Sequence, residues 1–138
     1  MVINPASPDE RLVAIVDDDA SIRRSTSRLI RSLGYRAEVF GSAEAFLDSG
    51  RAAKTACLIL DLRMPGMDGL ELQRRLAENG PPIPIVFITG RASEEEQQRA
   101  LRGGAVAFLR KPVDKEVLVR VLATALQMSA REGGNREG

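Results

Sequence analysis

The sequence contains no histidine and no tryptophan, and it has a single cysteine. Without histidine, the chain cannot use an imidazole for acid–base catalysis, bind zinc through histidine, or act as a phosphohistidine donor. The lone Cys57 opens an apolar run, and this position favours a small core residue over a reactive thiol. These features suggest a reduced, cytoplasmic protein.

Long apolar runs and a strong net charge are also missing. No run approaches the roughly 18–20 residues that a membrane span needs. The first residues, MVINPASPDER, lack the basic start and apolar centre of a signal peptide. The net charge of +1, with no basic block, gives no sign of affinity for DNA or anionic membranes through bulk charge. A length of 138 residues fits one soluble domain.

Apolar runs of strand length alternate with stretches of helical spacing between residues 11 and 128. The expected strands cover residues 11–16, 36–40, 56–60, 83–88 and 105–109. Helix signals lie between them: Ser42 and Ser93 are suited to N-caps, and Glu96 completes a capping box with Ser93. Gly34, Gly80 and the pair Gly103–Gly104 fall where helices should end.

This alternation predicts an α/β fold: a doubly wound (βα)5 arrangement with a parallel sheet and helices on both faces. We expect one domain over residues 11–128. Residues 1–10 carry prolines and small polar residues, which predict a flexible N-terminus. Residues 129–138 are glycine-rich and charged, which predicts a flexible tail or the start of a linker.

Polar residues stand where the expected strands end. Asp17 and Asp18 follow the first strand, Asp61 the third, Thr89 the fourth, and Lys111 the fifth. In doubly wound folds these carboxyl ends form the ligand site, so the side chains should converge. Three neighbouring carboxylates need a counter-charge, and an all-oxygen ligand set favours Mg²⁺. With a lysine and a hydroxyl beside it, such a carboxylate is suited to accept a phosphoryl group.

Each of these residues also has a simpler interpretation. The acidic run from Asp17 could be a polar turn before a helix, and we assign Asp19 to that structural role. Asp68 is read as turn chemistry with Gly69. Thr89 could bond only to backbone, and Lys111 could be a solvated loop residue.

Four stretches in order, VDDD, LDLRMPGMDG, ITG and RKP, resemble the receiver domain of two-component response regulators. The resemblance covers about residues 11–128, and LDLRMPGMDGLELQ is most similar to the FixJ-type branch. It implies the CheY-like, flavodoxin-type sheet with strand order 2-1-3-4-5. It also implies a signalling phosphoacceptor rather than an enzyme, able to phosphorylate itself from small donors and to lose the group slowly.

The resemblance implies a role for each site residue. Asp61 is the phosphoacceptor and a metal ligand, Asp18 is a direct Mg²⁺ ligand, and Asp17 acts through a metal-bound water. The backbone carbonyl of Arg63 is the third protein ligand, and Mn²⁺ can replace Mg²⁺. Thr89 and Lys111 bind phosphoryl oxygens.

The switch residues are Thr89 and Phe108, although an aromatic in a fifth strand could be simple core. Thr89 is expected to move toward the phosphoryl group and Phe108 to fill the space it leaves. The two arginines that lie two residues beyond Asp61 and Thr89, Arg63 and Arg91, could tune dephosphorylation or simply be exposed. Whether Lys111–Pro112 is cis stays open.

The implied partners are a sensor histidine kinase or a phosphotransfer protein, with a second copy of the chain after phosphorylation as a further candidate. No membrane is involved, and DNA would be reached only through an output domain outside this sequence, as in FixJ-type transcription regulators. The alternatives are a stand-alone receiver in a phosphorelay and a constitutive interaction module. A haloacid dehalogenase-type phosphatase is disfavoured, because Arg63 stands where that class needs a second acid.

Overall fold

The computed structural model describes residues 11–80 and 82–137, and these residues contain one five-stranded parallel sheet. Its strand order is β2-β1-β3-β4-β5, which confirms the order that the family resemblance implied. The strands are β1 (Leu12–Val16), β2 (Arg36–Phe40), β3 (Thr55–Leu60), β4 (Ile85–Thr89) and β5 (Ala107–Arg110). Every residue of β1, β3 and β4 is buried, as expected for central strands covered on both faces.

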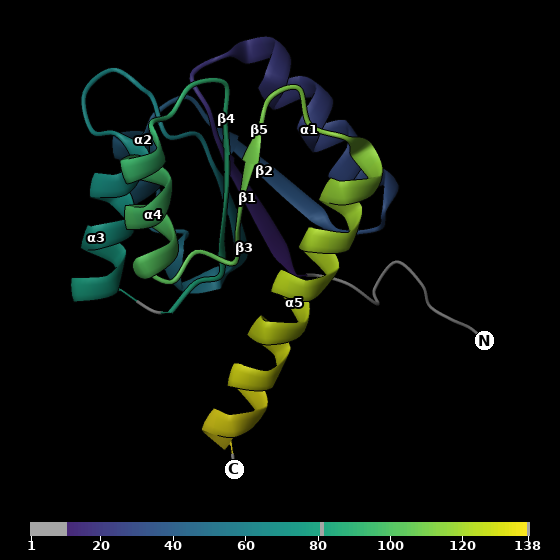
Figure 1. Ribbon diagram of the computed structural model, residues 1–138. Coiled ribbons are helices and arrows are strands. Elements are labelled where there is room, and N and C mark those ends of the chain that lie inside the picture. Colours follow the sequence, from purple (N-terminus) through teal and green to yellow (C-terminus); the bar gives the residue numbers. More distant parts are fainter. Residues whose placement is uncertain (1–10, 81, 138) are drawn as a thin grey trace.

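Helices cover the sheet on both sides, with α1 and α5 on one face and α2, α3 and α4 on the other (Figure 1). Their bounds are α1 (Ala20–Ser32), α2 (Ala43–Asp48), α3 (Gly69–Asn79), α4 (Glu94–Arg102) and α5 (Lys115–Glu137), with a 3₁₀ turn at Ala52–Lys54. The prediction of a doubly wound α/β fold is therefore confirmed.

The core has two layers, because successive strand residues point to opposite faces of the sheet. Val13 and Ile15 of β1 pack in the layer beneath α1 and α5, whereas Val16 packs in the layer beneath α2, α3 and α4. Phe46 and Phe87 are fully buried in the second layer. Burial of each such aliphatic or aromatic side chain stabilises the fold by about 1.5–3 kcal/mol.

Side-chain caps start the first four helices. Ser42 and Ser93 are N-caps, and Ser93 forms the expected capping box with Glu96. Asp19 caps α1 by accepting hydrogen bonds from the backbone of Ser21 and Ile22, so its structural role is confirmed. The interpretation of Asp68 as turn chemistry was wrong. Its carboxylate accepts a 2.9 Å hydrogen bond from Glu71 N and caps α3.

Cys57 is a buried core residue of β3, as predicted, and burial raises the pKa of its thiol to about 12. It lies in the layer beneath α1 and α5. A thiol with so high a pKa carries almost no thiolate near neutral pH, so it is chemically inert in the folded protein.

Some element bounds differ from the expectation. Strand β4 begins at Ile85 because Pro84 has no N–H for the ladder, and it continues to Thr89, which pairs with Arg110. Helix α5 runs to Glu137, past the expected domain boundary at residue 128. The predicted flexible N-terminus, residues 1–10, lies outside the described residues. None of the helices in the described parts is long and apolar enough to cross a membrane.

Candidate functional site

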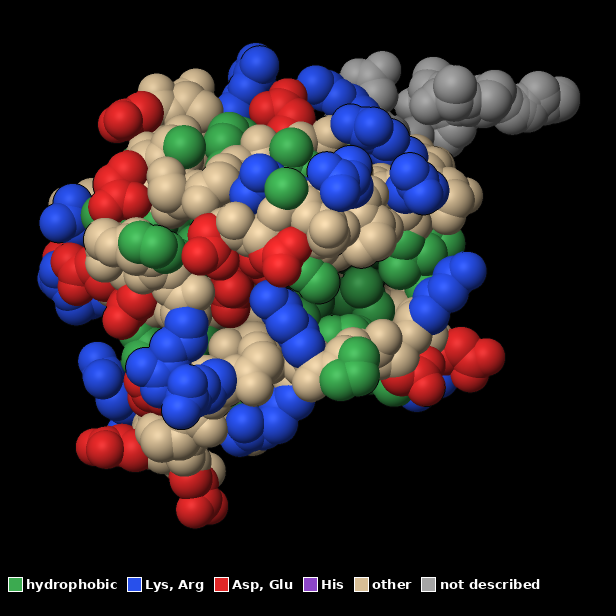
Figure 2. All heavy atoms as spheres, turned by 90° about the horizontal axis from the view of Figure 1, so that it is seen from above, with side chains coloured by type: hydrophobic (Ala, Val, Ile, Leu, Met, Phe, Trp, Pro, Cys, Tyr) green, Lys and Arg blue, Asp and Glu red, His purple; other side chains and the backbone are tan. Residues whose placement is uncertain are grey.

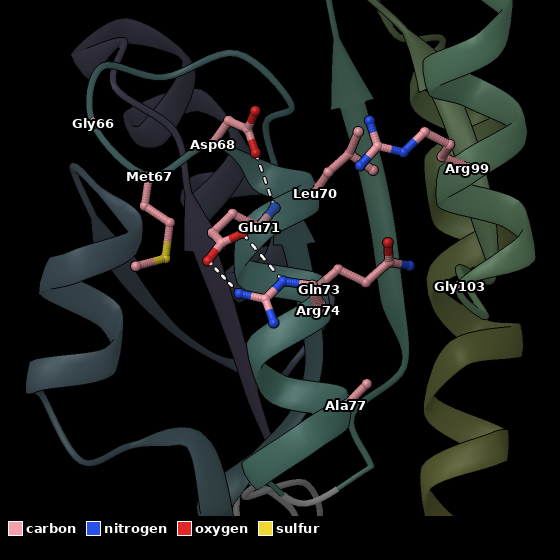
Figure 3. Close-up of a pocket in the computed structure, with 10 residues that line it drawn as sticks. All are labelled: Gly66, Met67, Asp68, Leu70, Glu71, Gln73, Arg74, Ala77, Arg99 and Gly103. Atoms are coloured by element: carbon pink, nitrogen blue, oxygen red, sulfur yellow. Dashed lines mark hydrogen bonds and ion pairs between the residues drawn. The ribbon is translucent and has the colours of Figure 1, made fainter.

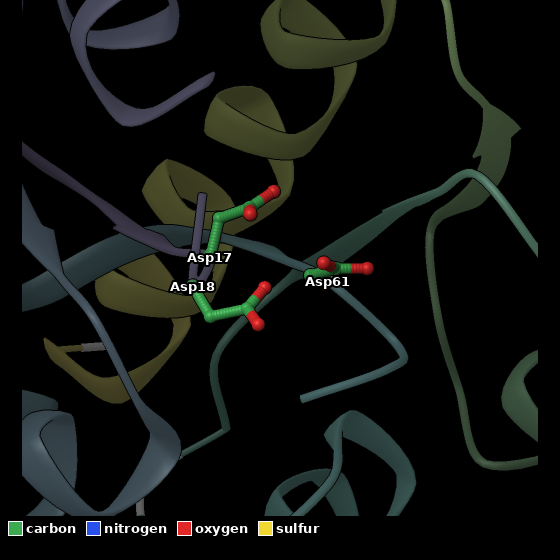
Figure 4. A group of neighbouring side chains, drawn as sticks. All are labelled: Asp17, Asp18 and Asp61. Atoms are coloured by element: carbon green, nitrogen blue, oxygen red, sulfur yellow. The ribbon is translucent and has the colours of Figure 1, made fainter. Parts of the chain in front are cut away.

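Three carboxylates meet where β1 and β3 end. Asp17 and Asp18 follow β1, Asp61 follows β3, and one oxygen from each lies within 4.8 Å of the others (Figure 4). The sheet brings them together because β1 and β3 are adjacent and in register, and Asp61 N donates to Val16 O at 2.9 Å. The predicted convergence of these three residues is therefore present.

Lys111 reaches this cluster from the end of β5. Its Nζ donates to Asp17 Oδ2 at 2.9 Å and to Asp61 Oδ2 at 3.4 Å. Burial opposes its charge, but the hydrogen bond to Asp17 and the charges of both carboxylates outweigh burial and raise the pKa of Lys111. The Lys111–Pro112 bond that follows is cis. The lysine is therefore a bound counter-charge and not a solvated loop residue.

One lysine does not balance three carboxylates. Asp17 and Asp61 are buried, and Asp18 is exposed. Burial, followed by the negative charge of Asp17, raises the pKa of Asp61 although Lys111 and the backbone of Arg63 act in the opposite direction. An added cation would relieve this cost, because it favours the ionised carboxylate. The all-oxygen donor set fits Mg²⁺ or Mn²⁺, so the residues present are compatible with such an ion.

The two neighbouring aspartates differ in their free oxygens. Asp17 Oδ1 accepts from Asp19 N at 2.9 Å and Asp17 Oδ2 accepts from Lys111. Within the described residues, by contrast, no donor reaches the Asp18 carboxylate. Asp18 is therefore the more available of the two for direct metal coordination, while Asp17 is already engaged by protein donors.

Thr89 is fully buried at the end of β4, and its hydroxyl faces its own loop. Thr89 Oγ1 donates to Arg91 O at 3.1 Å and accepts from Arg91 N at 3.3 Å. The simpler interpretation, a hydroxyl bonded to backbone, thus describes the arrangement seen here. Binding of a phosphoryl oxygen by Thr89 stays a prediction, and it requires this hydroxyl to turn.

Phe108 is half-buried in β5 and packs against Phe87, with ring centroids 5.9 Å apart. The guanidinium of Arg110 lies 5.9 Å from the Phe108 ring centroid. This ring is neither fully buried core nor fully exposed. Its role as a switch residue stays a prediction.

Several supporting residues escaped the sequence analysis. Arg110 donates from β5 to Ala92 O and Gln97 Oε1, both at 3.2 Å, and so ties the edge strand to α4. On the opposite side of the site, Glu44 of α2 accepts from Met67 N at 2.9 Å and holds the loop after β3. These contacts join segments far apart in the chain and leave no local pattern in the sequence.

Gly69 was read only as a turn residue, but the structure gives it a further role. A Cβ at Gly69 would lie 2.5 Å from Asp61 O and 2.9 Å from the Phe87 ring. No side chain fits in that space. Gly69 therefore lets the start of α3 approach the backbone of the central aspartate.

The site opens on the edge of the sheet where the strands end. Figure 2 looks onto this edge and shows acidic side chains near its centre, a basic side chain beside them, and an apolar hollow close by. A cavity of about 580 Å³ lies beside Lys111, between α1 and the start of α5. Ile22, Leu29 and Val113 contribute to its apolar wall. The cavity therefore adjoins the cluster on the side of Lys111.

Comparisons with known proteins agree with this geometry. A family described as "Response regulator receiver domain" matches residues 13–123. The response regulator protein TmoT of Ectopseudomonas mendocina is 42% identical over 126 residues, which cover 91% of this chain and 57% of TmoT. The transcriptional regulatory protein FixJ of Bradyrhizobium diazoefficiens is 35% identical over 85% of this chain and 57% of FixJ.

Solved structures agree as well. The response regulator StyR superposes with a TM-score of 0.85 at 41% identity, over 91% of this chain and 64% of StyR. The chain thus spans a little over half the length of the curated relatives described above.

Proposed function

Because this chain belongs to the response regulator receiver domain family, we propose that Asp61 accepts a phosphoryl group from a histidine kinase or a phosphotransfer protein. One observation carries the proposal. The carboxylates of Asp17, Asp18 and Asp61 lie within 4.8 Å of one another, and Lys111 donates to two of them. Three crowded carboxylates cost free energy unless a cation balances their charge, and a cation held there is placed to assist phosphoryl transfer to Asp61.

In the proposed transfer, a carboxylate oxygen of Asp61 attacks the phosphorus of a phosphohistidine. The new O–P bond forms as the P–N bond breaks, and the electron pair of that bond stays on the donor nitrogen. Lys111 Nζ, 3.4 Å from Asp61 Oδ2, is placed to leave Asp17 and donate to a phosphoryl oxygen. Thr89 supplies a hydroxyl to another oxygen after it turns away from Arg91 O.

A divalent cation, Mg²⁺ or in its place Mn²⁺, would supply positive charge to the phosphoryl oxygens when bound. Asp18, Asp61 and the backbone carbonyl of Arg63 would hold it directly. Asp17 would act through a water molecule, which agrees with the protein hydrogen bonds that both of its oxygens accept.

Phosphorylation would change the surface formed by α4, β5 and α5. Movement of Thr89 toward Asp61 opens space beside β5 that Phe108 can occupy, since the Phe108 ring already packs against Phe87 at the neighbouring strand. Raising the population of the active state from about 1% to 99% needs about 5.5 kcal/mol of stabilisation of that state relative to the inactive one. A second copy of the chain that binds the altered surface would supply part of it.

The chain belongs to a signalling family and acts as a phosphoacceptor, not as a conventional enzyme. We expect slow phosphorylation of Asp61 by small donors such as acetyl phosphate and slow loss of the group by hydrolysis. Arg63 and Arg91 flank the site and are expected to affect the rate of that loss. We also expect this chemistry to take place in the cytoplasm, where kinase-bound phosphohistidine is formed.

The output is proposed by analogy with the relatives. FixJ is named a transcriptional regulatory protein, and this chain spans 57% of its length. We therefore propose that an attached DNA-binding domain carries the output, with a stand-alone receiver in a phosphorelay as the alternative. Reading the coding sequence beyond Gly138 distinguishes the two.

The decisive test is the intact mass after incubation with acetyl phosphate and Mg²⁺. We expect one added phosphoryl group in the wild-type protein and none in Asp61→Asn or without a divalent cation. Beryllofluoride, a stable phosphoryl mimic, controls for rapid hydrolysis. Failure of the wild-type protein to take up either group would refute the proposed function.

A further inference from the structure

One arginine ties the loop after β3 to the start of α4. Arg63 Nη2 donates to Glu96 Oε1 at 2.7 Å, and Arg63 Nε donates to Arg91 O at 3.3 Å. Glu96 Oε1 also accepts from Ser93 N at 2.9 Å as part of the capping box. A single side chain from the Asp61 loop therefore holds both the loop before α4 and the first turn of this helix.

The same loop holds Thr89. The carbonyl of Arg91 accepts from the Thr89 hydroxyl at 3.1 Å and from Arg63 Nε at 3.3 Å. Thr89 must leave this carbonyl before it can bind a phosphoryl oxygen on Asp61. Arg63 therefore stabilises the loop conformation in which Thr89 is turned away from the phosphorylation site.

The opposite end of α4 is fastened differently. Gln73 of α3 is buried and donates from Nε2 to Ala100 O at 2.9 Å. A Cβ at Gly103 would lie 2.8 Å from the Gln73 side chain, which points toward this end of α4 (Figure 3). Breaking a buried hydrogen bond leaves unsatisfied polar groups, so this end of α4 resists movement.

The N-terminal end of α4 is easier to release. In the ion pair that holds it, the Arg63 side chain is 53% exposed and the Glu96 side chain is 23% exposed. Water can replace each partner of such a pair, which is why exposed pairs are weak. If α4 moves, its first turn at Glu96 would therefore separate from Arg63, while its C-terminal end near Gln73 stays in place.

We propose that the Arg63–Glu96 ion pair is a latch that opposes activation. It holds Thr89 away from Asp61 until a phosphoryl group on Asp61 attracts the Thr89 hydroxyl. The inference rests on the proposed function, since it assumes that Asp61 is phosphorylated and that Thr89 responds. Arg63 and Glu96 act here as positioning residues. Loss of an exposed pair corresponds to a change of about two- to fivefold in the equilibrium between the two states.

The test is the apparent Kd for beryllofluoride with saturating Mg²⁺, followed by NMR titration. The variants are Glu96→Gln, Arg63→Met and their combination. Glutamine retains an acceptor for the capping box, so the helix start is preserved. Glu95→Gln is the matched control, because Glu95 is exposed in the same turn and its side chain has no partner among the described residues.

We expect Glu96→Gln and Arg63→Met each to bind beryllofluoride two- to fivefold more tightly than the wild-type protein, and Glu95→Gln to leave the affinity within error. The double variant should bind no more tightly than the tighter single variant, because either change opens the same latch. A residue with a purely structural role would give the opposite sign, since its loss would weaken binding.

Hydrogen exchange provides a second readout in the absence of beryllofluoride. Amides in the first turn of α4 should exchange faster in Arg63→Met than in the wild-type protein, while those near Ala100 should not change. Three results would each overturn the latch. The first is unchanged hydrogen exchange in the first turn of α4 in Arg63→Met, and the second is a double variant whose gain in beryllofluoride affinity is the product of the two single gains. The third is equal beryllofluoride affinity of Glu96→Gln and Glu95→Gln. Absence of beryllofluoride binding by the folded wild-type protein would overturn the proposed function and the latch with it.

Discussion

Replacing Asp61 by asparagine should stabilise the protein when no divalent cation is present. The change keeps the shape of the side chain but removes one of three crowded negative charges. Burial, followed by the charge of Asp17, raises the pKa of Asp61, so its ionisation disfavours the folded state. A neutral side chain removes that cost.

The distances give the size of the effect. With an effective dielectric constant of about 20, two carboxylates within 4.8 Å of each other repel by about 3.5 kcal/mol or more. The attraction between Asp61 and Lys111 at 3.4 Å is about 5 kcal/mol on the same scale. The repulsion of Asp61 by Asp17 and Asp18 together therefore exceeds its attraction to Lys111 by about 2 kcal/mol. Because Asp18 is exposed, solvent reduces its share of this repulsion. We expect a gain of about 1–2 kcal/mol, or about 3–7 °C in Tm.

Thermal unfolding in EDTA and in Mg²⁺ measures this effect. The advantage of Asp61→Asn should be full above the raised pKa of Asp61 and should disappear once the pH falls below the ordinary value of 3.8, where the wild-type carboxyl is protonated in both the folded and the unfolded state. Mg²⁺ should raise the Tm of the wild-type protein more than that of the variant, because the variant has lost a ligand. A variant less stable than the wild-type protein in EDTA at pH 7 would contradict the electrostatic argument.

Further predictions concern the fold around the site. Gly69→Ala should lower the free energy of unfolding by about 1–3 kcal/mol in urea titrations, because its Cβ meets Asp61 O at 2.5 Å; unchanged stability would contradict this close contact. Ser93→Ala should cost about 0.5–2 kcal/mol in the same assay through loss of the cap on α4, and Ser93→Asp should retain most of the stability. Phe46→Ala should cost about 3–5 kcal/mol, since the ring is fully buried, and a loss below 1 kcal/mol would refute its place in the core. Cys57 should react with a thiol reagent only after unfolding, because its pKa is about 12; rapid labelling in native buffer would show exposure.

The strand ends were predictable because a buried parallel strand has a strong local signal. A continuous apolar run that stops at a polar residue marks both the strand and its carboxyl end, as at Asp61 and Thr89. Asp68 shows the limit of such local reasoning. The MDG sequence suits a turn or a helix N-cap, and only the geometry of α3 selects the cap.

The direction of a side chain was less predictable than its position. Thr89 stands at the expected strand end, but its hydroxyl is bonded to Arg91 O because the loop before α4 closes on it. Arg63 was read as a residue near the phosphorylation site, yet its guanidinium reaches Glu96, 33 positions further along the chain. No local pattern encodes a contact of that kind.

The sequence by itself determined the alternation of strands and helices, the carboxylates, hydroxyl and lysine at the strand ends, and the caps at Ser42 and Ser93. Each of these depends on neighbours within a few residues, so periodicity and short motifs reveal them. Only the tertiary structure decided how crowded the carboxylates are, which oxygens of Asp17 are already bonded, and how Arg63 joins the loop after β3 to α4. These properties arise where distant segments pack together, and packing in three dimensions sets their distances, burial and charge balance.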